Sequence, residues 1–310
     1  MNMPMKLPNE TPSGVGESGA GHAAKVQVVK ALPHAAETEP RSEPLHIEYS
    51  TTQVMADALV RLQRTHGVVK PDRSVLSESF KMLRNQVLQR LRADGHKLLA
   101  VTSPRRIEGK SLTAVNLALT IAADYDSAVL LVDADLSGGG LQSMFGLEGV
   151  RGLSDYLMNA APISELLVNP GLARFVLLPA GKQAVLNSAE LLATKLAQQL
   201  ISEMKHRYAD RYIIVDLPPL LDTADALAFL PQVDTTLVVV EEHTTSIQDM
   251  ESMAELLAPF NLIGTVMSQA RQTEKGVRAG ADKARKAPWY RRLIQGTRAG
   301  YRGSNPSASD

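Results

Sequence analysis

From residue 97 to residue 267 the chain alternates between short, wholly apolar runs and longer stretches in which apolar residues recur every three or four positions. The short runs predict β-strands, and the longer stretches predict helices with one buried face. The strands are expected at 97–103, 128–133, 174–178, 212–216, 235–241 and 262–267, and the helices at 111–124, 152–159, 188–208 and 246–258. Runs that are apolar throughout fit strands covered on both faces. The alternation therefore predicts an α/β fold with a doubly wound, mostly parallel sheet and right-handed crossovers.

The pattern changes towards both ends of the chain. Two further helices are expected at 54–65 and 77–93. Residues 1–45 hold six prolines, four glycines and few large apolar side chains, so this segment is expected to be disordered. The tail at 271–310 is polar, with ten Lys or Arg against three Asp or Glu, and is expected to be flexible. We therefore expect one domain at 46–270, between two tails.

Composition narrows the class of protein. The 310 residues carry no net charge, and no nucleic-acid partner is expected. The chain has no cysteine, which excludes disulfides, thiolate metal sites and a cysteine nucleophile, and fits a reducing compartment. No apolar run is long enough to span a bilayer, and the first 30 residues hold no signal-peptide core. We expect a cytoplasmic protein whose contact with a membrane is peripheral or made through a partner.

The first candidate site lies between a predicted strand and a predicted helix, where residues 102–111 read TSPRRIEGKS. A turn that opens a helix presents successive backbone N–H groups to an anion. Gly109 allows close approach of a phosphate, Lys110 reaches the β- and γ-phosphates, and Ser111 binds Mg²⁺. Pro104 replaces the first glycine of the usual G-x-x-x-x-G-K-[ST] pattern, and an ordinary strand–helix turn is the alternative interpretation. The expected nucleotide contacts are Arg106, Glu108, Gly109, Lys110, Ser111 and Leu112.

Two later strands are expected to end in carboxylates. Asp133 and Asp135 lie at the carboxyl end of the strand at 128–133, and their spacing points both side chains to one side if the strand persists. Asp216 closes the strand at 212–216, which is the Walker B arrangement that holds Mg²⁺. Each could be a solvated strand end, but three such features in order favour a P-loop NTPase that binds ATP and Mg²⁺. The catalytic candidates are Lys110, Asp133, Asp135 and Asp216, and the metal ligands are Ser111, Asp133 and Asp216.

The order of these motifs, a phosphate loop, then LVDAD, then IIVDLPP, resembles the bacterial tyrosine kinases (BY-kinases) of polysaccharide synthesis and export. These kinases belong to the wider ParA/MinD group of P-loop ATPases. Four segments resemble especially the tyrosine autokinases of exosortase-associated exopolysaccharide loci: SPRRIEGKSLTAVNLAL, GLSDYL, LLPAGKQAVLNSAELLATKL and DLPPLLDTADALAF. The resemblance covers residues 46–270.

The resemblance implies ATP-dependent autophosphorylation on C-terminal tyrosines, here Tyr290 and Tyr301. It implies activation at the inner membrane by a polysaccharide co-polymerase, or chain-length regulator, and control of polymer length or export. The family's subunit-contact pattern E-x-x-R-x-x-R appears as Glu78, Lys81 and Arg84, which implies a homo-oligomer.

The chain departs from the family pattern at four places. Lys81 replaces one arginine, and Ser137 begins an S-G-G-G segment where the family has arginine after the paired aspartates. The last strand ends in Met-Ser instead of Leu-Asn, and the tyrosine cluster is reduced to two. Three functions stay open: a protein-tyrosine autokinase, an ATP-driven switch that acts on a membrane partner, and a non-catalytic nucleotide-sensing subunit of an export complex.

Overall fold

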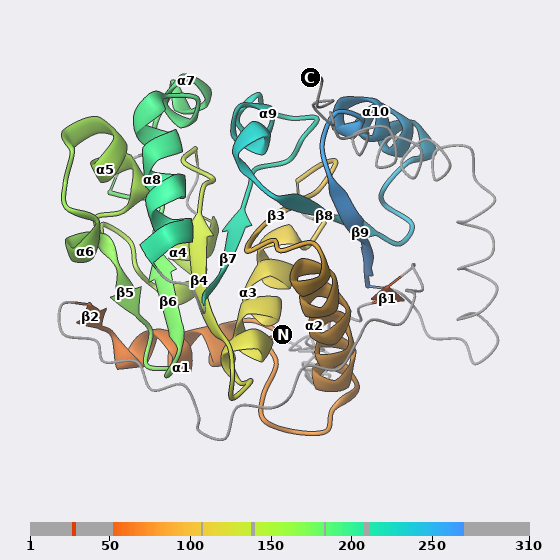
Figure 1. Cartoon of the computed structure of the whole chain (residues 1–310). Coiled ribbons are helices and arrows are strands. Elements are labelled where there is room, and N and C mark those ends of the chain that lie inside the picture. Colours follow the sequence, from red (N-terminus) through yellow and green to blue (C-terminus); the bar gives the residue numbers. More distant parts are fainter. Residues whose placement is uncertain are drawn as a thin grey trace, which may run out of the picture.

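The computed structural model describes residues 27–28, 52–106, 108–137, 140–182, 184–207 and 211–269. Its centre is a sheet whose strands, across the described part, lie in the order β1-β9-β8-β3-β7-β4-β6-β5-β2 (Figure 1). The strands are β1 (Gln27–Val28), β2 (Gln53–Val54), β3 (Leu98–Thr102), β4 (Ala128–Asp133), β5 (Val168–Asn169), β6 (Phe175–Leu178), β7 (Arg211–Asp216), β8 (Thr235–Glu241) and β9 (Leu262–Ser268).

The middle of the sheet is parallel. Strands β9, β8, β3, β7, β4 and β6 pair in parallel with their neighbours, whereas β1 pairs antiparallel with β9, and β5 antiparallel with β6. The register places Val101 beside Asp216 and Asp133 beside Asp216, so the carboxyl ends of β3, β7 and β4 lie side by side. The predicted mostly parallel, doubly wound sheet is confirmed, and its carboxyl edge gathers the candidate residues.

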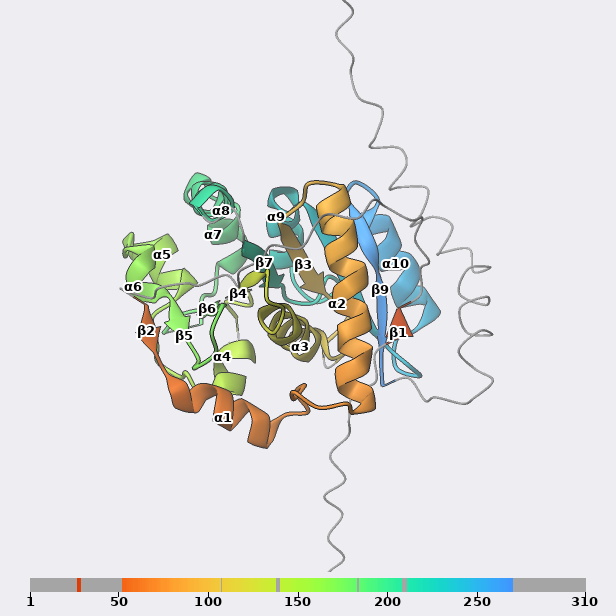
Figure 2. The same cartoon turned by 60° about the horizontal axis from the view of Figure 1, so that its bottom comes forward.

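Helices cover both faces of the sheet (Figures 1 and 2). One face packs against α1 (Ala56–Thr65), α2 (Val75–Ala93), α3 (Lys110–Ala122) and α4 (Gly140–Phe145). The other packs against α5 (Leu153–Asn159), α6 (Ile163–Leu166), α7 (Ser188–Leu192), α8 (Lys195–Arg207), α9 (Asp225–Phe229) and α10 (Ile247–Leu257), with a 3₁₀ turn at Leu230–Gln232. Each face thus has its own apolar core, as expected of a three-layer α/β domain.

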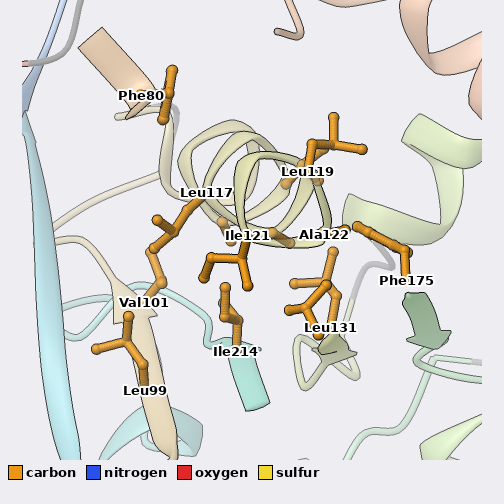
Figure 3. Close-up of a cluster of buried hydrophobic side chains, with 14 of the residues drawn as sticks. Phe80, Leu99, Val101, Leu117, Leu119, Ile121, Ala122, Leu131, Phe175 and Ile214 are labelled. Atoms are coloured by element: carbon orange, nitrogen blue, oxygen red, sulfur yellow. The ribbon is translucent and has the colours of Figure 1, made fainter. Parts of the chain in front are cut away.

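Helix α3 lies at the centre of the first core. Its apolar side chains are buried on all sides, because α2 covers it on one flank and the sheet lies beneath it (Figure 3). Ile121 points down to Ile214 of β7, and Leu117 lies between Phe80 of α2 and Val101 of β3. A helix that is apolar all round must be enclosed. Its first turn, at the phosphate loop, is therefore carried on a rigid support.

The structure differs from the predicted elements in three ways. The helix predicted at 188–208 is two helices, because the hydroxyl of Thr194 accepts a hydrogen bond from the N–H of Ala197 (3.2 Å) and begins α8 anew. The short elements α4, α6, α9 and β5 were not expected, since two to six residues carry too little periodicity. Gln27 and Val28 form β1 inside the segment expected to be disordered.

The two outermost strands of the sheet come from the start of the chain. β1 lies on β9 at one edge, and β2 lies on β5 at the opposite edge.

Among the described residues, no helix combines the length and the apolar character needed to cross a bilayer.

Candidate functional site

The phosphate loop joins β3 to α3 at the carboxyl edge of the sheet. Gly109, immediately before α3, has φ of 84°, a left-handed conformation that a residue with a Cβ adopts only under strain. Helix α3 then begins at Lys110, with Ser111 and Leu112 in its first turn. The first backbone N–H groups of a helix have no intrahelical acceptor, so this turn offers them to an anion.

The side chain of Glu108 shapes the loop from inside. Its carboxylate accepts a hydrogen bond from the hydroxyl of Thr245 (2.6 Å) and another from the backbone N–H of Arg105 (3.0 Å). The carbonyl of Glu108 accepts a bond from the hydroxyl of Ser268, the last residue of β9 (2.9 Å). Burial raises the pKa of Glu108 despite the two bonds to its carboxylate. The predicted contact of Glu108 with nucleotide would therefore come from its backbone.

The two arginines of the loop are tied to neighbouring elements. The guanidinium of Arg105 bonds Asp222, after β7, at 3.0 Å and Asp249, in α10, at 2.9 Å. The second oxygen of Asp222 accepts the backbone N–H of Arg106 at 3.1 Å. Hydrogen bonds from Ser246 and from Arg105 hold the pKa of Asp249 below its usual range. The loop is thus fastened to two elements on the other face of the sheet.

Four charged side chains meet where β3, β4 and β7 end. The ammonium of Lys110 lies 3.4 Å from a carboxylate oxygen of Asp135 and 3.4 Å from one of Asp216. Asp133 lies beside Asp216 in the strand register, and both are fully buried. The structure therefore brings together all four residues that the sequence proposed as catalytic.

These carboxylates crowd one another. Burial, with the negative charges of Asp216 and Asp135, raises the pKa of Asp133 to about 8, although Lys110 opposes the shift. Burial also raises the pKa of Asp216. Burial alone would lower the pKa of Lys110, but the three carboxylates raise it. The site therefore holds more negative charge than its single lysine neutralises, which is the setting in which a cation binds.

Asp135 reaches the site by a route that the sequence did not predict. The strand ends at Asp133, as its predicted bounds have it, so the condition under which both carboxylates would alternate along one strand does not hold. A turn follows, in which the N–H of Asp135 donates to Asp133 (3.2 Å). The hydroxyl of Ser137 donates to Asp135 at 2.8 Å. Ser137, at the position where the family has arginine, thus holds Asp135 in place.

The donor set fits a magnesium ion held together with phosphate. One oxygen of Asp216 is buried and has no hydrogen-bond partner in the described part of the structure, and the Ser111 hydroxyl bonds this carboxylate. Within the described residues, no group of three His, Cys, Asp or Glu side chains forms a metal cage by itself. Mg²⁺ takes oxygen ligands and is commonly bound by one or two carboxylates plus substrate phosphates. Ser111, Asp133 and Asp216 can supply the protein share of such a site.

Gln142 in α4 is a residue of this site that the sequence reasoning missed. Its backbone N–H donates to Asp133 at 3.3 Å. Its buried side-chain amide donates to the carbonyls of Leu147 (2.8 Å) and Val150 (3.2 Å) and accepts the N–H of Gly181 (3.3 Å). These side-chain hydrogen bonds hold α4 in place. The backbone N–H of Gln142 in turn orients Asp133.

The remaining candidates lie away from the carboxyl edge. In α2, Glu78 pairs with Lys81 of the same helix at 2.8 Å, and Arg84 donates to the carbonyl of Thr120 at 3.2 Å. Tyr290 and Tyr301 lie outside the described residues.

The comparisons with known proteins agree with this geometry. The profile of the family described as ParA, NUBPL iron-transfer P-loop NTPase, matches residues 95–269. The chain belongs to the ParA-type P-loop NTPases. This family implies a bound nucleotide with a divalent metal ion.

Two relatives identify a narrower family within the ParA-type P-loop NTPases. The tyrosine-protein kinase CpsD of Streptococcus agalactiae is 30% identical over 165 residues, which cover 53% of this chain and 69% of CpsD. The succinoglycan biosynthesis transport protein ExoP of Rhizobium meliloti is 30% identical over 223 residues, or 71% of this chain and 28% of ExoP. The chain is a member of the bacterial tyrosine kinase family, and the resemblance drawn from its motifs is confirmed.

A solved structure supports the same assignment. The kinase domain of the Escherichia coli tyrosine kinase ETK is 25% identical and superimposes with a TM-score of 0.60, covering 73% of this chain and 91% of that domain. The chain spans about a quarter of the length of several curated relatives that it matches.

Proposed function

We propose that the chain is a protein-tyrosine autokinase that uses ATP and Mg²⁺ and regulates exopolysaccharide polymerisation or export. The observation that carries the proposal is the meeting of Lys110 with Asp135 and Asp216 at the end of the strands, next to a phosphate loop. A lysine for the phosphates beside carboxylates for a metal is what phosphoryl transfer requires, because catalysis there is mainly positioning and charge stabilisation.

Nucleotide binding would use the loop in its described form. The N–H groups of Lys110, Ser111 and Leu112 point out of the first turn of α3, and the ammonium of Lys110 would leave Asp135 for the γ-phosphate. Asp133, Asp216 and the hydroxyl of Ser111 would hold Mg²⁺. The ion, when bound, neutralises charge on the phosphates.

Transfer also needs a proton acceptor, because an unperturbed tyrosine has a pKa of about 10. We assign this role to Asp135. Asp133 already accepts two backbone N–H groups and, like Asp216, is fully buried, whereas Asp135 keeps an exposure of 6%. Once Lys110 turns to the phosphates, the carboxylate of Asp135 is free to accept the phenolic proton.

The acceptor tyrosines would be Tyr290 and Tyr301, in the basic tail that follows β9. A flexible linker of this length spans tens of ångströms, which is enough to reach a neighbouring subunit. Glu78, Lys81 and Arg84 on α2 would contact that neighbour in a homo-oligomer. A membrane polysaccharide co-polymerase would supply the activating contact, holding a cytoplasmic chain peripherally at the inner membrane.

The test is to incubate the purified chain with ATP and Mg²⁺, with and without the cytoplasmic segment of the membrane partner, and to map phosphate by mass spectrometry. We expect phosphate on Tyr290 or Tyr301. The Lys110→Met variant should lose it, and Lys70→Met, at an exposed lysine away from the site, should keep it.

Either of two results would overturn the kinase proposal. If ATP is hydrolysed but no tyrosine is modified, even with the partner's segment present, the ATP-driven switch is the better description. If ATP binds and is neither hydrolysed nor transferred, the chain is a nucleotide sensor.

A further inference from the structure

Tyr125 is an exposed tyrosine that the proposed function does not use. It lies in the turn between α3 and β4, at the edge of the sheet opposite the phosphate loop, and its residue exposure is 71%. The other two tyrosines of the described part, Tyr156 and Tyr212, are half-buried, and the hydroxyl of Tyr212 accepts a bond from Arg92 at 3.1 Å. For the hydroxyl of Tyr125, no hydrogen bond is present among the described residues.

A guanidinium stands beside this ring. The Arg174 guanidinium carbon lies 5.8 Å from the ring centroid of Tyr125, and its Nε donates to the carbonyl of Ala122 at 3.3 Å. Within the described residues Arg174 forms no ion pair. It also has φ of 61°, which is uncommon for a residue with a Cβ. In the described part of the structure, an arginine that bonds no carboxylate thus lies against an exposed tyrosine.

We propose that Tyr125 is a further phosphoacceptor, modified by another copy of this chain, and that Arg174 binds the phosphate. The proposal rests on the proposed tyrosine kinase function. A phosphotyrosine carries close to two negative charges and three strong acceptor oxygens, and arginine pairs with phosphate through a two-pronged hydrogen bond. Arg174 would exchange a weak contact with the ring for this stronger one.

The chemistry balances without any further reagent. The phenolic oxygen of Tyr125 forms a bond to the γ-phosphorus of ATP, and the bond from that phosphorus to the β,γ-bridging oxygen breaks. The phenolic proton passes to a carboxylate of the kinase subunit and then to solvent. The products are phosphotyrosine and ADP.

The donor must be a second molecule. Helix α3 has 13 residues and a rise of about 1.5 Å per residue, so its ends are about 20 Å apart. Lys110 is the first residue of α3, and Tyr125 lies three residues beyond its last residue, Ala122. The carboxyl edge of one copy must therefore meet the amino edge of another, the lower edge of the sheet in Figure 1. Such a head-to-tail contact is heterologous and closes into a ring when the rotation allows it.

The neighbouring charges explain why Arg174 is needed. Tyr125 lies between Asp124 and Asp126 and directly follows the negative end of the α3 dipole. These groups repel a phosphate, and a phosphate at a helix C-terminus without a cation loosens the helix end. Arg174, whose guanidinium lies against the ring, is placed to offset this repulsion. We therefore expect phosphorylated Tyr125 to depend on Arg174 for its stability.

The experiment uses two copies that mass spectrometry can tell apart. Full-length Lys110→Met protein labelled with ¹⁵N is mixed with unlabelled wild type, ATP and Mg²⁺, and phosphate is mapped on the labelled chain. We expect phosphate on its Tyr125. Adding Tyr125→Phe to the labelled chain should remove that phosphopeptide and leave the tail phosphopeptides unchanged. Tyr212→Phe, at a half-buried tyrosine, is the matched control and should change neither.

Each other result decides a different claim. Phosphate on Tyr290 or Tyr301 of the labelled chain, with none on Tyr125, overturns this inference and leaves the kinase function standing. Phosphate on Tyr125 of the unlabelled wild type alone overturns transfer between copies. If no tyrosine is phosphorylated on either chain, even after the cytoplasmic segment of the membrane partner is added, the kinase function itself fails.

The role of Arg174 has its own measurement. We expect phosphorylated Arg174→Met protein to melt about 2–4 °C below phosphorylated wild type, with a smaller difference between the unmodified proteins. Arg174→Lys, which keeps the charge but not the fork of donors, should lie between them. Equal melting temperatures for the two phosphorylated proteins would remove Arg174 from the proposal.

Discussion

Asp234 lies at the amino end of the parallel strands and Asp133 at their carboxyl end. The charged and hydrogen-bonding groups around the two carboxylates differ. Asp234, just before β8, accepts the N–H groups of Lys97 and Leu98 at 2.9 Å each and the ammonium of Lys205 at 2.6 Å. Burial alone would raise its pKa, but these bonds lower it. Asp133 is buried among other carboxylates, and its pKa rises to about 8.

The difference separates a structural carboxylate from a functional one. Asp234 has donors for both oxygens, so its charge is stabilised in the folded protein and fastens the amino end of β3 to β8 and α8. The charged form of Asp133 is destabilised by burial and by Asp216 and Asp135, and that of Asp216 by burial and by Asp135, until a metal ion arrives. A buried carboxylate with a raised pKa and a like-charged neighbour destabilises the folded protein. Such a group therefore indicates a binding site and not a purely structural role.

The largest effect should follow from removing the cation that faces the buried carboxylates. Lys110→Met takes away the charge that faces Asp135 and Asp216 and that would face the γ-phosphate. We expect phosphoryl transfer to fall by about 10²–10³-fold or more, the usual cost of losing one transition-state contact. The fold should survive, because Asp133 and Asp216 can bind protons. A single-turnover assay checks the loss of transfer and circular dichroism checks the fold, and normal turnover in the folded variant would contradict the P-loop assignment.

The comparison itself is tested by three matched substitutions. Asp133→Asn and Asp216→Asn should each lower transfer about 100-fold while keeping some nucleotide binding, because a metal contact matters more in the transition state than in the ground state. Asp234→Asn should leave transfer per folded molecule unchanged and lower the free energy of unfolding by about 1–2 kcal/mol, since Lys205 loses its partner.

Chemical denaturation and single-turnover assays on the same samples distinguish the two kinds of aspartate. If Asp234→Asn impairs transfer as strongly as Asp133→Asn, the amino edge takes part in the reaction. If Asp133→Asn is as active as wild type, Asp133 is merely a strand end.

The pH dependence of stability should differ in sign between the two edges. The pKa of Asp133 is raised from 3.8 to about 8, so in metal-free protein its contribution is full below pH 3.8 and is lost as the pH rises towards 8. The pKa of Asp234 is lowered, so its contribution is present above pH 3.8 and is lost as the pH falls through the lowered value. A shift of one pKa unit corresponds to about 1.4 kcal/mol.

We therefore expect the alkaline loss to shrink in Asp133→Asn, where the raised pKa of Asp216 remains, and the acid loss to shrink in Asp234→Asn, as measured by urea unfolding from pH 3 to pH 9. Addition of Mg²⁺ and nucleotide should reduce the alkaline loss in wild type. Identical pH profiles for wild type and Asp133→Asn would refute the raised pKa.

A smaller effect is expected from Gln142→Ala. Loss of the amide frees α4 from Leu147, Val150 and Gly181, and Asp133 is then less well oriented. The Mg²⁺ concentration at half-maximal activity should rise about 10-fold, in line with other substitutions that orient a metal ligand, with a smaller change in the maximal rate. Gln248→Ala, at an exposed glutamine of α10, is the control. A drop in maximal rate alone would assign Gln142 another role.

The sequence predicted the parallel core and the meeting of Lys110, Asp133 and Asp216, because both follow from local patterns. Long apolar runs fix the central strands, and the carboxyl ends of parallel strands share one edge. The short elements α4 and α9 were missed, and with them Gln142 and Asp222, whose contacts depend on turns of a few residues. No sequence period marks such residues, since a buried glutamine that fastens two turns looks like any polar residue of a loop.

Asp135 shows the limit in another form. The sequence placed Asp135 on the same side as Asp133 only if the strand continued past Asp133, but the chain leaves the strand there and the hydroxyl of Ser137 bonds Asp135. The pairing of Arg105 with Asp222 and Asp249 was also not predicted, because its members are 117 and 144 residues apart. Such contacts depend on tertiary packing that a single sequence does not display.

The placement of β1 and β2 has a consequence for the lifetime of the protein. A sheet edge with unpaired N–H and C=O groups is a template on which further chains can add, and proteins cover such edges to stay soluble. Here both covers come from the first 54 residues of the chain, one on β9 and one on β5. A single proteolytic cut between β2 and α1 would therefore separate both covering strands from the domain. β9 and β5 would then expose unpaired backbone groups on which other chains could add, at both edges of the sheet.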